Sequence, residues 1–194
     1  MILVFDTETT GVPLDGLPDE HPSQPHLVQL GVALHMDEGK EVSSASLIVQ
    51  PDGWTIPDGA VKAHGITTAM ANTFGIPLPV VLGVYFNLRR IVQEVVAYNI
   101  DFDLRIMRIA ALRNGKKPSH PGPDKMTCVM RKVTPIIALP PTEKMKAAGF
   151  TKNKPPKLGQ AYQHFFKEEL VGAHDALIDA RATARLFFHL RGQP

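Results

Sequence analysis

The sequence predicts an α/β domain built on a mixed β-sheet. Three segments near the N-terminus have the short length and the apolar or alternating pattern of strands, namely residues 2–6, 26–36 and 42–49. Gly39 and Lys40 lie between the last two, which suggests a hairpin. A helix, a strand and a helix then follow, and two more helices close the chain. This order favours a mixed sheet covered by helices.

The remaining elements lie after these three strands. We expect a short helix around residues 59–63, a strand at 94–98, and longer helices over residues 79–93, 102–113, 157–166 and 174–190. The apolar face of the first long helix should comprise Val80, Leu82 or Val84, Leu88 and Ile91. Residues 116–157 are rich in Pro and Lys and predict only fragments of strand or helix, near 126–139.

Length and composition favour one globular domain spanning residues 1–194. No apolar run approaches the ~18 residues of a membrane span, so we expect no membrane partner. The start of the chain lacks the basic and apolar regions of a secretion signal. Cys128 is the single cysteine and has no internal disulfide partner. We therefore expect a cytoplasmic protein with Cys128 in its core.

Charge is unevenly placed along the chain, although the formal net charge is only +2. Residues 1–60 hold ten Asp or Glu and one Lys, a local net of −9, whereas residues 113–157 hold eleven Lys or Arg and two acids, a local net of +9. Two solvated faces would explain this pattern. An acidic metal site beside a basic track for phosphates would explain it equally well.

Asp6 and Glu8 belong to the first candidate motif, Asp6-Thr-Glu8-Thr-Thr-Gly11. Side chains two apart on a strand point to the same face, so two carboxylates lie side by side at the end of an apolar run. Unpaired carboxylates there would repel each other and lose hydration. A divalent cation, which prefers oxygen ligands, would bind both. The alternative is a capping Asp and an exposed Glu.

The second motif, Asn99-Ile-Asp101-Phe102-Asp103, lies where a strand leads into a helix. Either aspartate would supply a third carboxylate. Both also suit a helix start, Asp101 as the N-cap and Asp103 in the first turn, where the helix dipole favours a negative charge. The pattern alone leaves these alternatives open.

The third motif begins at His174 and ends at Asp179, which lies among alanines on the core-facing side of a helix. A buried carboxylate without a partner is costly, so Asp179 needs a cation or an arginine, either Arg181 or Arg185. A spacing of five places two residues about 140° apart around a helix. His174 therefore shares a site with Asp179 only if it precedes the regular helix.

Together the motifs supply four carboxylates and one histidine, which suit phosphodiester hydrolysis with two divalent cations. One cation lowers the pKa of its bound water, and the second, about 3.5–4 Å away, stabilises the leaving oxygen. A histidine adds a proton acceptor that is effective near neutral pH. The sequence contains no nucleophilic-serine, P-loop, dinucleotide-binding or Cys-x-x-Cys motif.

These motifs resemble the histidine subgroup of the DEDD 3′→5′ exonucleases, which includes the proofreading subunit of bacterial replicative DNA polymerase. The matching positions are Asp6, Glu8, Thr9, Thr10 and Gly11 in the first motif, Asn99, Phe102 and Asp103 in the second, and His174 and Asp179 in the third. A His-Gly-Ile segment between the first two motifs matches at residues 64–66. The resemblance spans residues 2 to about 190 and selects Asp103 over Asp101.

The resemblance implies a ribonuclease-H-like fold, in which helices flank a mixed five-stranded sheet. It implies that two divalent cations, Mg²⁺ or Mn²⁺, bind to Asp6, Glu8, Asp103 and Asp179, and that His174 is the general base. It also implies that Thr9, Thr10, His64 and Phe102 contact the terminal nucleotide, Phe102 through apolar contact or stacking that tolerates any base. For His64 the alternative is a loop histidine beside a turn glycine.

The implied activity is release of nucleoside 5′-monophosphates from the 3′ ends of nucleic acids, with single-stranded DNA as the expected partner. RNA trimming is an alternative, because the motifs do not report on the 2′-hydroxyl. A non-catalytic, polymerase-associated binding module is another, although the complete acidic set argues against it. Association with a DNA polymerase stays open. Part of the basic segment 113–157 would track the substrate backbone, or else serve as a solubilising loop or partner surface.

Overall fold

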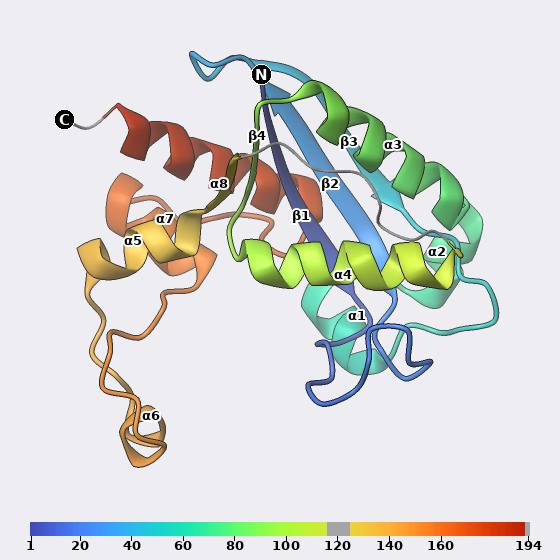
Figure 1. Cartoon of the computed structure of the whole chain (residues 1–194), viewed down its shortest axis with the longest axis horizontal. Helices are drawn as coiled ribbons and strands as arrows, with labels where there is room; N and C mark the ends of the chain where they lie inside the picture. Colours follow the sequence, from blue (N-terminus) through green and yellow to red (C-terminus); the bar gives the residue numbers. More distant parts are fainter. Residues whose placement is uncertain (116–124, 193–194) are drawn as a thin grey trace.

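The computed structural model describes residues 1–115 and 125–192 and shows a central sheet covered by helices (Figure 1). The strands in these ranges are β1 (Ile2–Thr9), β2 (Leu27–His35), β3 (Glu41–Ile48), β4 (Glu94–Ala97) and β5 (Lys125–Cys128). They form one five-stranded sheet in the order β3-β2-β1-β4-β5. The sheet is mixed, as predicted, because β1 pairs antiparallel with β2 and parallel with β4.

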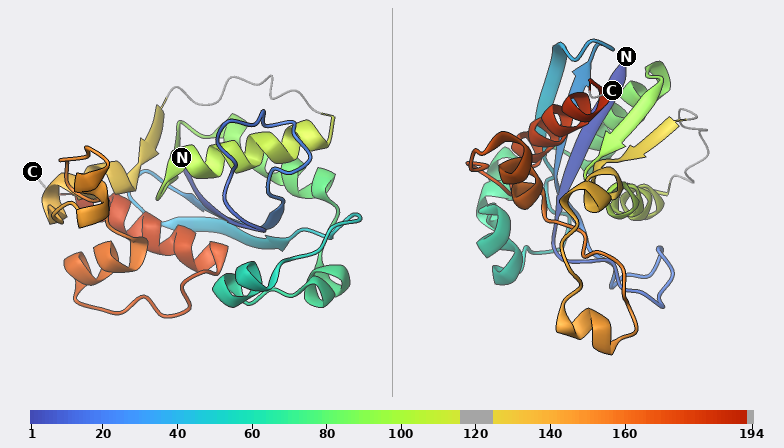
Figure 2. Two further views of the ribbon diagram at one scale, coloured as in Figure 1. Left: turned by 90° about the horizontal axis from the view of Figure 1, so that it is seen from below. Right: turned by 90° about the vertical axis from the view of Figure 1, so that its left-hand side faces the viewer.

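Two layers of helices enclose the sheet (Figure 2). The helices in the described residues are α1 (Asp58–His64), α2 (Thr68–Phe74), α3 (Leu78–Ile91), α4 (Ile100–Arg113), α5 (Val129–Ile137), α6 (Glu143–Ala147), α7 (Leu158–Phe166) and α8 (Ala176–Arg191). The layer of α3 and α4 covers one face of the sheet, and α8 covers the other with α7 packed beside it. The sheet therefore has a buried core on each face.

Successive side chains of β1 point alternately into these two cores. Leu3 and Phe5 pack in the core that includes buried residues of α3 and α4. Ile2 and Val4 pack on the other face, against residues of α8 such as Phe187. Since side chains alternate along a strand, residues 6 and 8 continue the α8 face. The two acidic side chains of β1 are thus directed toward the layer that contains α8.

Two helical predictions need correction. Helix α2 was not predicted, because only Ala71 is buried in this short segment and no apolar stripe marks it. The predicted face of α3 is correct only in part. Leu82 is buried, and Val84 and Leu88 pack against the core. Val80 and Ile91 are more than half exposed instead, and the buried Val81 and Tyr85 were not predicted. The ring of Tyr85 packs against Phe5 of the sheet, with ring centroids 5.0 Å apart, and this tertiary contact sets the orientation of the helix.

The basic segment of the sequence is partly described. Residues 116–124 lie outside the described residues, and β5 and α5 account for the fragments predicted near 126–139. Residues 138–157 form an arm that carries α6 and extends beyond the helical layers (Figure 1). The hydroxyl of Tyr98 anchors the C-terminal end of this arm by donating a hydrogen bond to the Pro156 carbonyl, 2.8 Å away. What the lysines of this arm bind stays a prediction.

Two expectations from composition concern Cys128 and membrane association. Cys128 is buried, as predicted, and its thiol donates to the Tyr98 carbonyl at 3.2 Å. Among residues 1–115 and 125–192, no helix combines the length and the apolar character that crossing a membrane requires.

Gly31 of β2 lies where the start of α8 crosses the sheet. It is paired with Asp6 across the β1–β2 ladder. A Cβ atom at this position would lie 2.2 Å from the carbonyl carbon and oxygen of Ala176 and 2.4 Å from the Leu177 nitrogen. These neighbours are backbone atoms, which no change of rotamer moves. Only a residue without a side chain therefore allows α8 to lie this close to β2.

We predict that Gly31→Ala lowers the free energy of unfolding by about 3 kcal/mol or more, because overpacking against a fixed backbone forces the helix away. Chemical denaturation followed by circular dichroism would measure the loss. Gly83→Ala, in the interior of α3, is the matched control because a Cβ atom there meets nothing within 4 Å. It should raise stability by up to about 1 kcal/mol. Equal stability of Gly31→Ala and the parent would contradict the close-packing argument.

Candidate active site

The first two predicted site residues stand at the end of β1 next to β2. Asp6 is paired with Gly31 and Glu8 with Gln29 across the β1–β2 ladder. Opposed residues on neighbouring strands share a face, so Gln29 and Gly31 lie beside the two acids on the face that α8 covers. The prediction that Asp6 and Glu8 share one face thus agrees with the packing of the strand.

The second motif supplies Asp103 from the first turn of α4. The Asp103 side chain is 3% exposed, and its Oδ1 accepts a hydrogen bond from the Thr7 hydroxyl at 2.7 Å. Asp101 is exposed instead and forms an ion pair with Arg131 at 3.0 Å. Asn99 is the N-cap of α4, so neither aspartate has the capping role. Burial therefore separates the two aspartates that the sequence pattern left as alternatives.

The third motif reaches the site from the start of α8. Asp175 is the N-cap, and its carboxylate accepts from the backbone N–H groups of Leu177 and Ile178. His174 precedes the helix with a φ of 69°, in the left-handed region, as its sharing of a site with Asp179 requires. Its backbone N–H donates to Asp179 Oδ2 at 3.1 Å. The turn before α8 thus brings His174 and Asp179 together despite their spacing of five.

The arginines that could have neutralised Asp179 are paired elsewhere. Arg181 binds Glu41 at 2.7 Å, and Arg185 binds Glu168 at 2.6 Å. Asp179 is 8% exposed, and its Oδ1 is buried without a hydrogen-bond partner in the described part of the chain. A buried carboxylate oxygen in this state is costly. Of the two options that the sequence left for Asp179, the arginine pair is excluded by the structure.

The predicted residues converge on one small pocket of about 210 Å³. Its lining includes all five predicted catalytic residues: Asp6, Glu8, Asp103, His174 and Asp179. Ligand atoms of Glu8, His174 and Asp179 all lie within 4.8 Å of one another. His174 lines the pocket and is itself exposed to solvent. Four acids from three different elements thus share one site with a single histidine.

The electrostatics of the pocket are those of crowded carboxylates. Burial, and then the charges of Asp103, Asp179 and Glu8, hold the pKa of Asp6 well above its ordinary value. Burial, followed by neighbouring acids, raises the pKa of Glu8 to about 8. Burial raises the pKa of Asp103 to about 7, although the Thr7 hydroxyl opposes the shift. Glu8 and Asp103 therefore retain protons to near-neutral pH unless a positive charge joins them.

These features fit divalent cations. The donor set is made of hard oxygen ligands, and Asp179 Oδ1 has no protein partner. None of the ion pairs found among the described residues involves any of the four acids. A cation between them would offset both the burial and the mutual repulsion that raise their pKa values. The individual roles of the residues as ligands or base stay predictions.

The predicted substrate-contact residues occupy different places around the pocket. Phe102 lines it, whereas Thr9, Thr10 and His64 do not. The Thr9 hydroxyl donates to the Gly11 carbonyl at 2.6 Å, and the Thr10 hydroxyl accepts from the His26 N–H at 2.8 Å. His64 ends α1, and burial together with the nearby charge of His174 lowers its pKa. Its Nε2 is buried without a partner among the described residues.

The motif analysis missed Thr7 and Gln29, which contact the predicted site residues and the start of α8. Gln29 is 3% exposed; its Nε2 donates to Asp175 at 3.1 Å and its Oε1 accepts from the Ala176 N–H at 3.0 Å. It fixes the start of α8 beside Glu8. The sequence contained one signal of this, because Gln29 is a polar residue within an otherwise apolar strand. Thr7 gave no such signal, since it lies between two acids.

Comparisons with known proteins identify the family and the fold of the chain. A model of the RNase_T family, described as exonuclease, matches residues 3–187. E. coli exonuclease I in complex with a dT13 oligonucleotide superposes with a TM-score of 0.76 at 20% identity, over 98% of this chain and 41% of that one. The zinc-bound form of the E. coli exonuclease I complex with single-stranded DNA gives 0.76 at 20% identity, over 99% and 40%. Exonuclease I from Methylocaldum szegediense gives 0.75 at 20% identity, over 99% and 40%.

The chain spans about two fifths of the length of these solved structures. Among curated proteins, no sequence match was found. The superpositions confirm the ribonuclease-H-like fold that the resemblance implied. Because the family model matches nearly the whole described sheet and α8 up to Phe187, the chain belongs to the RNase_T family of exonucleases.

Proposed function

We propose that this chain is a metal-dependent 3′→5′ exonuclease of the histidine subgroup of DEDD enzymes, and that it acts on single-stranded DNA. The observation that carries the proposal is the convergence of four acids and His174 on one pocket, in which Asp179 Oδ1 has no protein partner. Such a donor set is unstable without a positive charge and suits the binding of two divalent cations. Membership of an exonuclease family supports the same reaction.

We assign the proposed catalytic roles to residues of the pocket, and their positions support the assignment. When bound, the cations would lower the pKa of a water molecule and stabilise the leaving oxygen. His174 accepts the proton of the attacking water and releases it to solvent, to which its side chain is exposed. Its backbone N–H orients Asp179, and the Thr7 hydroxyl orients Asp103. Phe102, in the pocket wall, contacts the terminal nucleotide through its ring without selecting a base.

The choice of DNA over RNA is supported by the solved structures. Several structures of E. coli exonuclease I that share this fold contain single-stranded DNA oligonucleotides, and one is a zinc-bound form. These structures are about 20% identical to this chain, so single-stranded DNA is a proposed substrate of this chain. Mg²⁺ or Mn²⁺ remains the proposed metal, since hard oxygen ligands dominate the pocket.

Cleavage of end-labelled strands tests the proposed function. We predict that the protein with Mg²⁺ or Mn²⁺ shortens 5′-labelled single-stranded DNA from its 3′ end and releases nucleoside 5′-monophosphates. Duplex DNA and both forms of RNA, assayed in parallel, define the preference. Asp6→Ala should abolish cleavage, because it removes one of the four acids. Cleavage that persists in excess chelator, or that is faster on RNA, would contradict the metal or the substrate proposed.

Stability should depend on pH and metal in a linked way. The raised pKa values of Glu8, about 8, and Asp103, about 7, mean that the folded state binds more protons than the unfolded state between about pH 4 and 8. The metal-free protein should therefore lose stability as pH rises through this window. Mn²⁺ should restore it by mass action, and more at pH 8 than at pH 5, because cations compete with protons for the acids.

Thermal melting at several pH values, with and without Mn²⁺, would measure this linkage. Asp6→Ala is the control, and both its pH dependence and its Mn²⁺ shift should be smaller than those of the parent. A Mn²⁺ shift that is equal at pH 5 and pH 8 would show that the acids do not release protons on binding.

His174→Ala should reduce the rate of cleavage by ~10²–10⁴, the usual contribution of a positioned general base. Its Mn²⁺-induced melting shift should be close to that of the parent, because His174 is proposed as a base. His164→Ala is the matched control, since His164 is an exposed histidine on α7 outside the pocket. If the Mn²⁺ shift disappears together with the rate, His174 is a metal ligand instead.

A further inference from the structure

A larger hollow lies away from the catalytic pocket, at the other end of α4. Its volume is about 680 Å³, within the range of small-molecule sites. It lies between the start of β2, the segment after β3, the start of α3 and the end of α4. Leu27, Val49, Leu78 and three prolines supply apolar walls. The volume is enough for a mononucleotide, and the walls contain ring-shaped and branched side chains.

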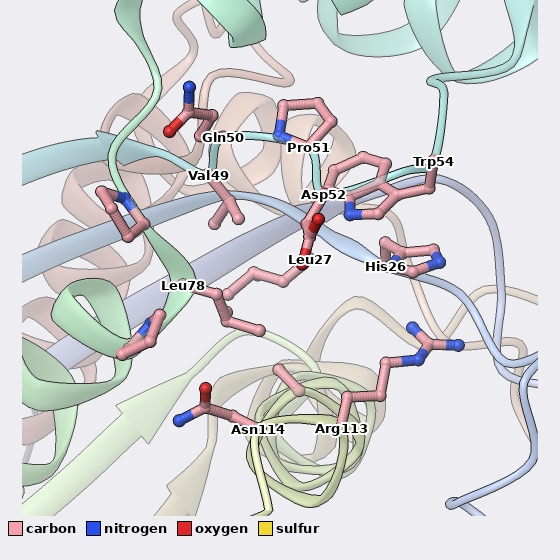
Figure 3. A pocket seen from close by; sticks show the side chains of 13 residues that line it. His26, Leu27, Val49, Gln50, Pro51, Asp52, Trp54, Leu78, Arg113 and Asn114 are labelled. Carbon is pink, nitrogen blue, oxygen red and sulfur yellow. The ribbon is translucent and has the colours of Figure 1, made fainter.

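One wall is a stacked aromatic pair. The rings of His26 and Trp54 are parallel within 15°, with centroids 4.5 Å apart. Figure 3 shows these rings one above the other at one end of the hollow, with Leu78 toward the opposite end. Burial, and then the charge of Arg113, lowers the pKa of His26 to about 4, so its ring is uncharged at neutral pH. An uncharged π-surface of this kind favours a flat heterocycle as ligand.

The polar groups of the hollow suit the edge of such a heterocycle. Gln50, Asp52 and Asn114 line it, and none of their side chains forms a hydrogen bond with another described residue. Two amides and a carboxylate offer both donors and acceptors, as nucleobase edges require. Arg113 is already committed, because its guanidinium donates to the carbonyls of Pro22, Gln24 and Pro25. The hollow therefore favours a base more than a phosphate.

The aromatic pair is connected to the catalytic strand. Thr10 follows Glu8 by two residues, and its N–H donates to the His26 carbonyl at 3.0 Å while its hydroxyl accepts from the His26 N–H at 2.8 Å. His26 and Trp54 also line a second hollow of about 540 Å³, which begins at Thr10 and Gly11. The two hollows thus share the aromatic pair, and the second reaches the catalytic motif.

We propose that the larger hollow is a second nucleotide site, in which a nucleobase packs against Trp54 and His26 and meets Asp52, Gln50 and Asn114 with its polar edge. The inference rests on the proposed function, because a DNA strand and the released nucleoside monophosphate are the sources of bases that this enzyme meets. Both sources present the same chemistry. The experiment below distinguishes them from each other.

Trp54 is the single tryptophan of the chain, so its fluorescence reports directly on this hollow. A stacked base should quench it. The titrants are deoxyguanosine, deoxythymidine, their 5′-monophosphates, ribose 5-phosphate and a single-stranded oligonucleotide. Oligonucleotide titrations use Asp103→Asn, in which cleavage should be lost and Trp54 is unchanged. We expect quenching by the nucleosides and by the monophosphates with affinities within a few-fold of each other, and none by ribose 5-phosphate.

Asp52→Ala is the diagnostic variant, because Asp52 is exposed and its removal leaves the core intact. It should weaken binding at least about tenfold, as the loss of a hydrogen bond to a charged group does. Glu38→Ala is its matched control; Glu38 is exposed and lies beyond the opposite end of β2. Trp54→Ala, studied by calorimetry after its melting curve shows that it is folded, should lose about tenfold or more through the loss of stacking.

Quenching by the free nucleosides and monophosphates shows that the hollow binds mononucleotides. Quenching by the oligonucleotide alone shows that it binds the substrate strand. Either result supports the proposal if Asp52→Ala weakens the binding that the quenching measures. No quenching by any titrant, or equal affinity of Asp52→Ala and the parent, would overturn it. Cleavage of labelled DNA by the parent protein is measured separately. Loss of cleavage with quenching retained would reject the exonuclease function alone, and the reverse result would reject the second site alone.

Discussion

The close contact between α8 and β2 at Gly31 is the constraint on which the candidate site depends. Gly31 is paired with Asp6, so the missing side chain leaves its space immediately beside the first acid. The Ala176 backbone fills that space. Because Asp179 is in the first turn of α8 and His174 directly precedes the helix, their distance from Asp6 and Glu8 is set by this contact. The absence of a side chain at Gly31 thus allows α8 to approach β2 and so determines how close Asp179 lies to the acids of β1.

The site combines this fixed geometry with unfavourable electrostatics. Two acids come from β1, one from α4 on one face of the sheet and one from α8 on the other. The acids from the two helices are held by neutral donors rather than by a cation: the Thr7 hydroxyl donates to Asp103, and the His174 backbone N–H donates to Asp179. Neutral donors orient a carboxylate without neutralising it. The repulsion therefore remains available to drive cation binding, while the apolar cores on both faces maintain the fold.

The sequence allowed the strands, the long helices and the five predicted catalytic residues of the pocket to be placed, because each depends on local periodicity or on a short motif. It left Asp101 and Asp103 as alternatives from the residues alone, since only tertiary burial makes them different. The face of α3 was predicted only in part for the same reason, because the tertiary contact of Tyr85 with Phe5 shifts the buried face away from Val80 and Ile91. The roles of Gly31 and Gln29 depend on register between β1 and β2, which no periodicity in a single strand reveals.

The contacts of Thr10 bear on how the Thr-Thr segment would meet a nucleotide. Its hydroxyl accepts from the His26 N–H, and its own N–H donates to the His26 carbonyl. A hydroxyl that accepts one hydrogen bond still has its own proton to donate. Thr10 is therefore suited to donate to a sugar or phosphate oxygen of a DNA strand while it remains hydrogen-bonded to His26. The same residue joins the strand of Asp6 and Glu8 to the aromatic pair of His26 and Trp54.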